Sequence, residues 1–215
     1  MLRNKQHNYD PIWHVELIVL LAIALQLALP DRFVFGVHWL LPMLEVVLAV
    51  LLAATTPRQR VFASVKRRLT VVLLVTVIGL GNLYALGRVA SLLLQQGKIS
   101  NGRELILTAI NIYFTNIIIF TLLYWEMDGG GPGRRHAPHA TERDFLFPQS
   151  SVPGLQNWHP TSVDYLYVAS TNATAFSPTD TLPLTRRAKL LMLVQGFVSL
   201  VVIALVAARA VNILN

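Results

Sequence analysis

The sequence predicts an all-α integral membrane protein with five transmembrane helices and a re-entrant segment before the last of them. The chain has 215 residues, of which 54% are hydrophobic and only 13% are charged, and its mean hydropathy is +0.53. Soluble domains carry ~45–50% apolar and ~25% charged residues, so this chain has too few charges to cover a globular surface. Its apolar residues also form blocks longer than ~18 residues, the length that crosses a bilayer. These observations argue against a soluble enzyme.

The first apolar block covers residues 13–29. It follows Arg3 and Lys5, and a basic start of this kind is also typical of a cleaved signal peptide. The only pair of small residues that resembles a cleavage site, Ala22 and Ala24, lies inside the apolar run instead of after it. We therefore interpret the block as a retained span.

Two further blocks complete a three-span bundle expected over residues 1–104. The second block, 33–55, follows a tight turn at Pro30, which predicts an antiparallel helical hairpin with the first block. The third block extends over 69–94. At ~1.5 Å per residue, each of these blocks is long enough for a hydrocarbon core of ~30 Å.

The second half of the chain, residues 105–215, is organised around two further spans. An outer helix is expected over 105–126, a polar loop rich in glycine and proline over 127–160, and an inner helix over 188–214. Between the loop and the inner helix, residues 161–185 are too polar for a lipid-facing span and too apolar for a plain linker. This composition predicts a re-entrant segment.

The basic residues predict the orientation. With five crossings, most of the 18 Lys and Arg fall on the side of the amino terminus. The positive-inside rule therefore places the amino terminus in the cytoplasm of a multi-pass protein of the cell membrane. The basic residues expected on the opposite side are Arg32, Arg88, Lys98, Arg103 and Arg209.

The re-entrant segment carries a specific pattern. The pattern consists of Asp164, Leu166 and Tyr167 near the start of the segment, Thr174 in its middle, and Asp180, Pro183 and Thr185 near its end. It resembles the pore region of the tetrameric potassium-channel superfamily, in which an outer helix is followed by a pore helix, a filter and an inner helix. The resemblance places the first three residues at the start of the pore helix, Thr174 at its end and the last three at the exit. The segment is also similar to small bacterial five-span membrane proteins of unknown function. The resemblance implies a homotetramer, and its usual topology is opposite to the one that the basic residues predict.

The filter departs from the family pattern. Ala175-Phe176-Ser177-Pro178-Thr179 stands where the family has Thr-Val-Gly-Tyr-Gly. A potassium filter aligns backbone carbonyls, and such an alignment needs glycine because positive φ is costly for other residues. The sequence therefore predicts a path of different selectivity, with monovalent cations as candidate ions and Asp180 as a ring of charge. The expected pore and filter positions are Thr171, Thr174, Ala175, Phe176, Ser177, Pro178, Thr179, Asp180 and Pro183.

An acidic residue lies deep inside a predicted span. Glu45 is near the middle of the second block, where a charge costs ~2.5–3.5 kcal/mol on insertion scales. Arg88 in the third block falls at a similar depth, so we expect an intramembrane Glu45–Arg88 pair. Either the pair stabilises helix packing, or Glu45 acts as an ion or proton relay.

Three functional interpretations remain open from the residues alone. The first is an ion channel that lacks the potassium-selective filter. The others are a non-conducting structural or partner-binding membrane protein of the same fold and a small transporter working through Glu45. The chain has no cysteine, and no catalytic constellation, metal site or cofactor is predicted. The expected partners are further copies of the chain and membrane lipid, and no nucleic acid is expected.

Overall fold

The computed structural model describes residues 12–34, 42–47, 50, 65–94, 102–132, 143–155, 158–175 and 180–214. Residues 42–47 are helical. In chain order, the other elements are α1 (Ile12–Leu27), the 3₁₀ turn η1 (Asp31–Phe33), α3 (Val65–Leu94), α4 (Gly102–Met127), η2 (Asp128–Gly130), β1 (Phe145–Leu146), η3 (Pro148–Ser151), α5 (Ser162–Ala175), β2 (Leu182–Pro183) and α6 (Arg186–Leu214).

Three helices are long and apolar enough to cross a membrane. The qualifying stretches are Arg68–Leu93 in α3, Arg103–Gly130 in α4 and Arg186–Arg209 in α6, and a shorter apolar helix covers His14–Leu27. The expectation of a mostly helical chain with helices apolar enough for a membrane is therefore confirmed, and the number of five spans stays a prediction. Most of the second predicted span, 33–55, lies outside the described residues.

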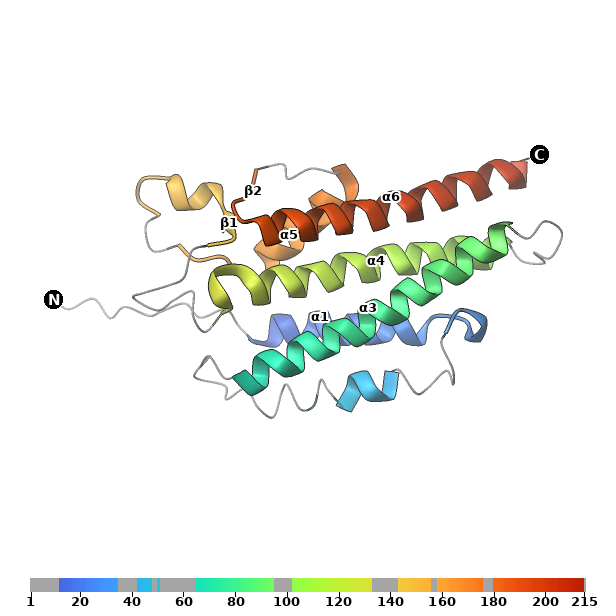
Figure 1. The fold of residues 1–215 in the computed structure, drawn as a ribbon, viewed down its shortest axis with the longest axis horizontal. Helices are drawn as coiled ribbons and strands as arrows, with labels where there is room; N and C mark the ends of the chain where they lie inside the picture. The colour runs from blue at the N-terminus through green and yellow to red at the C-terminus, as the bar shows by residue number, and fades with distance from the viewer. Residues whose placement is uncertain are drawn as a thin grey trace.

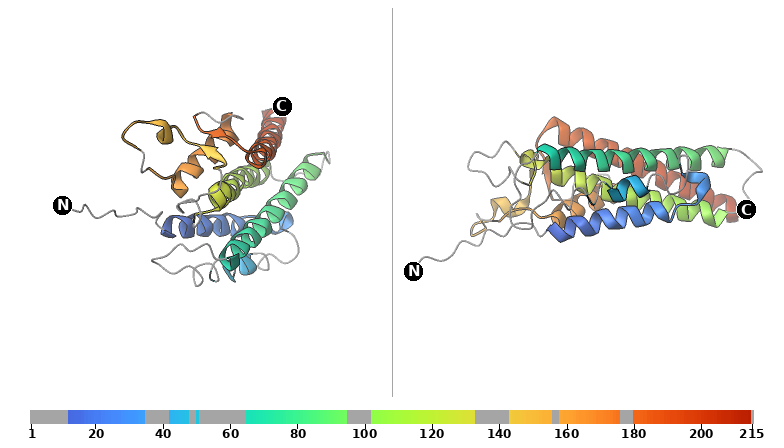
Figure 2. Two further views of the ribbon diagram at one scale, coloured as in Figure 1. Left: turned by 60° about the vertical axis from the view of Figure 1, so that its left-hand side comes forward. Right: turned by 90° about the horizontal axis from the view of Figure 1, so that it is seen from below.

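Helix α4 occupies the centre of the molecule. It packs against α1 and α3 on one side and against α5 and α6 on the other (Figures 1 and 2). Within its most apolar stretch 67% of the residues are buried inside the chain, against 22% in α6. The face of α6 that the chain leaves uncovered is therefore available to lipid or to another subunit.

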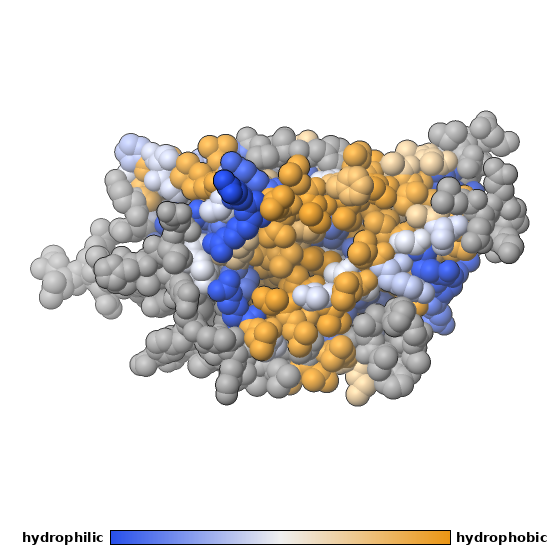
Figure 3. Space-filling view, in the orientation of Figure 1, coloured by the Kyte–Doolittle hydropathy of each residue, from blue (hydrophilic) through white to orange (hydrophobic). Residues whose placement is uncertain are grey.

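The outer surface of the helices is apolar in the middle and polar at both ends. Figure 3 shows a broad hydrophobic band across the helices, with hydrophilic residues on either side of it. Large exposed side chains on α6 contribute to this surface, among them Leu193 and Phe197, which are 68% and 67% exposed. Such an arrangement is typical of a surface that faces hydrocarbon between two aqueous phases.

A layer of polar side chains divides the interior into two hydrophobic clusters. One cluster contains the first part of α3, the second part of α4 and the start of α6, and the other contains the remaining parts of these helices. Between the clusters, at mid-depth, each long helix contributes polar groups. We call this set the polar layer; its members are Gln26, Glu45, Asn82, Asn111, Thr115, Asn116, Gln195 and Ser199.

The chain after α4 folds back onto the bundle through a glycine-rich turn. Gly129, Gly130 and Gly131 have φ values of 61°, 82° and 96°, which L side chains rarely adopt. Beyond the turn, β1 pairs antiparallel with β2, with Phe145 opposite Pro183. These two short strands are an addition to the all-α expectation, and they join the 127–160 region to the segment that enters α6.

Aromatic side chains from the expected polar loop are part of the core. Phe145 and Phe147 are buried. Phe145 packs on Tyr124 and Tyr165, with ring centroids 5.1 and 6.3 Å apart, and Phe147 lies 5.5 Å from Trp158. The described part of this loop is therefore a packed cover over one end of α4 and α5, because its aromatic rings gain burial that a solvated loop would not provide.

Candidate functional site

Helix α5 is too short to cross a membrane. Its 14 residues correspond to ~21 Å at 1.5 Å per residue, whereas the hydrocarbon core measures ~30 Å. Near its end, the Thr174 hydroxyl lies 3.2 Å from the Tyr113 hydroxyl, and Tyr113 is near the middle of α4. Helix α5 therefore ends at about half the depth of the bundle.

The start of α5 is capped by its own residues. The backbone N–H and the hydroxyl of Thr161 both donate to Asp164 Oδ2, at 2.7 and 2.8 Å. This is the carboxylate half of a capping box, in which an acidic side chain three residues into the helix accepts from the residue that precedes it. Asp164, which the resemblance places at the start of a pore helix, thus sets where α5 begins.

The side chain of Gln195 joins the inner end of α5 to the two long helices α4 and α6. This fully buried residue of α6 donates from Nε2 to the carbonyl of Ala169 at 2.8 Å. Its Oε1 accepts from the Tyr124 hydroxyl at 2.6 Å and from Asn172 Nδ2 at 2.8 Å. We call Tyr124, Ala169, Asn172 and Gln195 the Gln195 cluster. It joins α4, α5 and α6 at one point.

Helices α4 and α6 are also joined directly beside this cluster. Asn116 Nδ2 donates to Ser199 Oγ at 3.0 Å and lies 3.4 Å from the carbonyl oxygen of Gln195. Both Asn116 and Ser199 are buried. In a membrane, such interhelical hydrogen bonds replace the hydrophobic driving force that joins helices in water.

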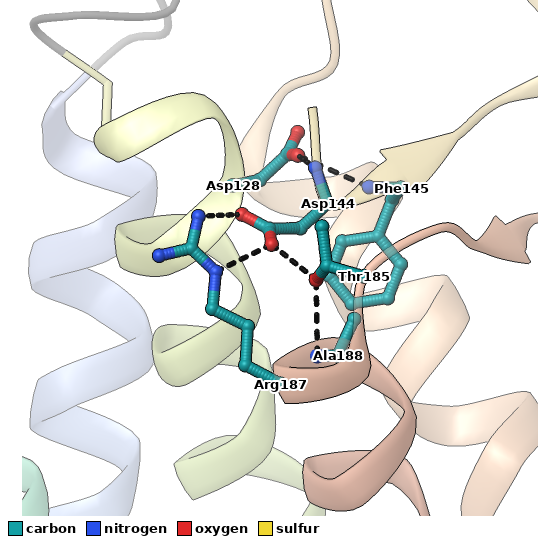
Figure 4. A network of polar contacts seen from close by, with 6 residues as sticks. All are labelled: Asp128, Asp144, Phe145, Thr185, Arg187 and Ala188. Carbon is teal, nitrogen blue, oxygen red and sulfur yellow. Dashed lines mark hydrogen bonds and ion pairs between the residues drawn. The ribbon is translucent and has the colours of Figure 1, made fainter. Parts of the chain in front are cut away.

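The outer end of the segment is held by an ion pair. Arg187 donates from Nε and Nη2 to the two carboxylate oxygens of Asp144, at 2.6 and 2.7 Å (Figure 4). The Thr185 hydroxyl donates to the same carboxylate and accepts from the backbone N–H of Ala188 at 3.3 Å, which caps α6. Asp144 is fully buried, whereas the Arg187 side chain is 51% exposed.

A second carboxylate extends this ion pair to α4 and α5. Asp128, at the end of α4, accepts from the backbone N–H groups of Asp144 and Phe145, at 2.7 and 3.2 Å (Figure 4). Its other oxygen accepts from the hydroxyl of Tyr165 in the first turn of α5. We call Asp128, Asp144, Tyr165, Thr185 and Arg187 the carboxylate clamp. Because Tyr165 and Thr185 belong to the same clamp, the first residues of α5 and of α6 lie at the same end of the bundle.

The expected pore positions are only partly described. Thr171 donates to the carbonyls of Tyr167 and Val168, and Thr174 donates to the carbonyl of Ser170. Ala175 and Asp180 are exposed, and Pro183 lies in β2. The central filter positions Phe176, Ser177, Pro178 and Thr179 lie outside the described residues.

The expected pairing of Glu45 with Arg88 needs correction. Glu45 is fully buried, but its Oε1 accepts from Gln26 Nε2 at 2.8 Å. Arg88 Nε instead donates to the carbonyl of Arg32 at 3.3 Å. The similar depths of the two residues suggested a contact. Depth alone does not give the rotation of each helix about its axis, and this rotation directs the two side chains to different neighbours.

No protein-family model, curated protein or solved structure matches this chain. The residues that join α5 to α4 and α6 were not among the predicted site residues. Gln195 carried a weak signal, since it is an amide within a largely apolar stretch. Asn172 carried none, because it stands among Ser and Thr residues. Asp128 and Asp144 carried none, because their partners lie up to 43 residues away in the chain.

Proposed function

We propose that this chain is one subunit of a symmetric homo-oligomeric membrane protein, a tetramer if the resemblance holds, in which α5 and the segment after it form a re-entrant loop around an ion path. The observation that carries the proposal is the half-length helix α5. It begins beside the start of α6, ends near the middle of α4 and is followed by a return to the same end.

The proposed subunit has five spans. Helices α3, α4 and α6 are the candidates for three of them, and the sequence predicts the other two over residues 13–29 and 33–55. The pore region comprises α4 as outer helix, α5 as pore helix and α6 as inner helix. The exposed apolar face of α6 supports this assignment, because an inner helix needs a surface for neighbouring subunits.

The proposed path conducts monovalent cations without selecting potassium in the usual way. The segment after α5 lacks the glycines of a potassium filter. Asp180 is exposed at the exit of the loop, where a ring of carboxylates from several subunits would raise the local concentration of cations.

Particle symmetry and ion flux test this proposal together. We expect single-particle images of the full-length chain in lipid nanodiscs to show a rotationally symmetric oligomer with α5 beside the axis. In proteoliposomes we expect monovalent cation flux, and Asp180→Asn should lower that flux about tenfold because it removes the focusing charge. Asp180→Glu, which keeps the charge, should retain most of the flux.

Glu16→Gln is a matched control, since Glu16 is also an exposed acid but lies on α1. It should leave the flux unchanged. A monomer, or an oligomer with α5 far from the axis, would contradict the channel. A symmetric oligomer without flux would support the non-conducting alternative, which is consistent with the Thr171 and Thr174 hydroxyls donating to their own helix.

A further inference from the structure

The most unusual buried group outside the re-entrant region is the carboxyl of Glu45. The residue is fully buried, and one oxygen, Oε1, accepts from Gln26. The other oxygen, Oε2, is also buried and has no hydrogen-bond partner among the described residues. Oε1 is thus bound to a neutral donor, and Oε2 remains available to a ligand.

The surroundings of Glu45 hold the amide of Gln26 in place. A Cβ atom at Gly81 of α3 would lie 2.8 Å from Gln26 Nε2, so the amide packs directly against α3 at this glycine. One residue before Gln26, the carbonyl of Leu25 accepts from Asn111 of α4 at 2.7 Å. Gln26 is therefore fixed between α3 and α4 in the polar layer, and it presents its N–H to Glu45.

No positive charge balances Glu45 in the described part of the chain. On α1, the nearest charged or titratable groups are at least ten residues from Gln26, ~15 Å along the helix. On α3, Tyr84 is three residues and Arg88 seven residues beyond Gly81, and Arg88 donates to the carbonyl of Arg32. The other described titratable side chains on α1, η1, α3 and α4 are His14, Glu16, Asp31, Arg32, Arg68, Arg103, Glu104, Tyr113, Tyr124 and Glu126.

An ionised carboxylate in this position would be costly. A buried charge needs a paired charge or several strong donors, and in hydrocarbon the cost of an acid without them is several kcal/mol. A neutral carboxyl avoids that cost. Its carbonyl oxygen accepts one amide hydrogen bond, as Oε1 does, and its proton resides on the second oxygen.

We propose that Glu45 is a proton-binding site within the membrane, with Oε2 as the atom that takes up and releases the proton. Uptake forms one O–H bond at Oε2 with a proton from water, and release returns the proton and leaves the carboxylate charge on Glu45. The site belongs to the N-terminal bundle, so it stands independently of whether α5 surrounds an ion path.

Labelling with dicyclohexylcarbodiimide tests this assignment, because this apolar reagent reacts with protonated carboxyls inside membranes. The full-length protein in liposomes is treated with the reagent, and the labelling of each acid is then measured by peptide mass spectrometry. We expect Glu45 to be labelled near neutral pH and the exposed Glu16 to remain largely unlabelled. Above the pH at which the proton is lost, labelling should fall ~10-fold per pH unit.

Two further measurements distinguish a bound proton from a bound metal cation and from simple exposure to water. Addition of sodium or potassium ions should not protect Glu45; protection would show a metal cation at Oε2 and overturn the proposal. A water-soluble carbodiimide should label Glu45 far less than the apolar reagent does. Equal labelling of Glu45 and Glu16, or none at Glu45, would also overturn it. Glu45→Gln, which keeps the acceptor for Gln26, confirms the assignment of the labelled peptide.

Discussion

At the scale of single residues, the polar side chains inside the bundle are notable for how completely some of them are bonded. Gln195 of α6 uses both lone pairs of Oε1 and one hydrogen of Nε2, and its partners belong to two other helices, α4 and α5. Asn172 shares its amide between Gln195 and the carbonyl of Met192. In the membrane interior there is no water to replace a lost hydrogen-bond partner. A broken bond there therefore leaves an unsatisfied polar atom.

The Tyr124 hydroxyl provides a measurable case. Tyr124→Phe keeps the ring and removes only the donor to Gln195 Oε1. We expect the free energy of unfolding in detergent to fall by about 1 kcal/mol, because membrane hydrogen bonds measured in this way are worth ~0.6 to ~1.7 kcal/mol. Equilibrium denaturation monitored by circular dichroism gives this free energy.

Tyr113→Phe is the matched control on the same helix. Its hydroxyl contacts Thr174, which is exposed and already bonded to its own helix. The loss of stability should stay within ~0.5 kcal/mol, as for surface substitutions in general. An equal effect of the two variants would show that the Gln195 cluster has no special role.

At the scale of elements, α5 depends on its neighbours. A helix of 14 residues is marginal on its own, and this one contains several Ser, Thr and Asn residues with modest helix propensity. It is stabilised by the cap at Thr161, by the Gln195 cluster and by the carboxylate clamp. A short semi-polar segment before the last helix could be predicted from composition, and its re-entrant character stays a prediction. The attachments could not be predicted, because most of them join residues that are distant in the chain.

The carboxylate clamp should be sensitive to the loss of Arg187. Arg187→Met leaves Asp144 buried without its cation, and breaking a buried pair in this way costs ~3–5 kcal/mol. Because the Arg187 side chain is 51% exposed, water screens part of the interaction, and we expect a loss of about 2 kcal/mol. Hydrogen exchange should also become faster at the Leu184 amide, which donates to the Asp144 carbonyl.

Arg186→Met serves as the control for charge at the membrane surface. Arg186 is exposed and next to Arg187 in the first turn of α6, so both substitutions remove one positive charge from the same region. Arg186→Met should leave the stability and the exchange of Leu184 unchanged. A similar effect of both variants would assign the clamp's contribution to lipid contacts instead of Asp144.

At the scale of the whole molecule, the arrangement follows from α4 at the centre. One face of α4 packs on α1 and α3 and the other on α5 and α6, so the two groups of helices share a single central helix. The polar layer crosses both halves at one depth. The proposed proton site at Glu45 and the inner end of α5 therefore lie in the same layer, on opposite sides of α4.

Cysteine labelling tests the predicted orientation of the molecule in the membrane. The excess of Lys and Arg on one side favours a cytoplasmic amino terminus, which places the turn at Asp31 outside the cell. Because the chain has no cysteine, Asp31→Cys introduces a single label site. We expect an impermeant thiol reagent to modify it from outside intact cells.

The complementary site is Arg143→Cys, which should react only after the membrane is permeabilised. The reverse result at both sites would support the channel-family topology and contradict the positive-inside assignment. Flux through the protein, if present, is compatible with either orientation, so this experiment is independent of the test with Asp180.

The sequence by itself determined that the chain is mostly helical, where the described long helices α3, α4 and α6 lie, and that a short semi-polar segment precedes the last one. These features follow from local composition, because every spanning helix satisfies its own backbone and needs only apolar side chains of sufficient number. It did not determine the partners of polar side chains. Glu45 with Gln26, Gln195 with Tyr124 and Asp144 with Arg187 are contacts that only the tertiary structure decided, since they depend on how each helix is rotated and which helices adjoin it.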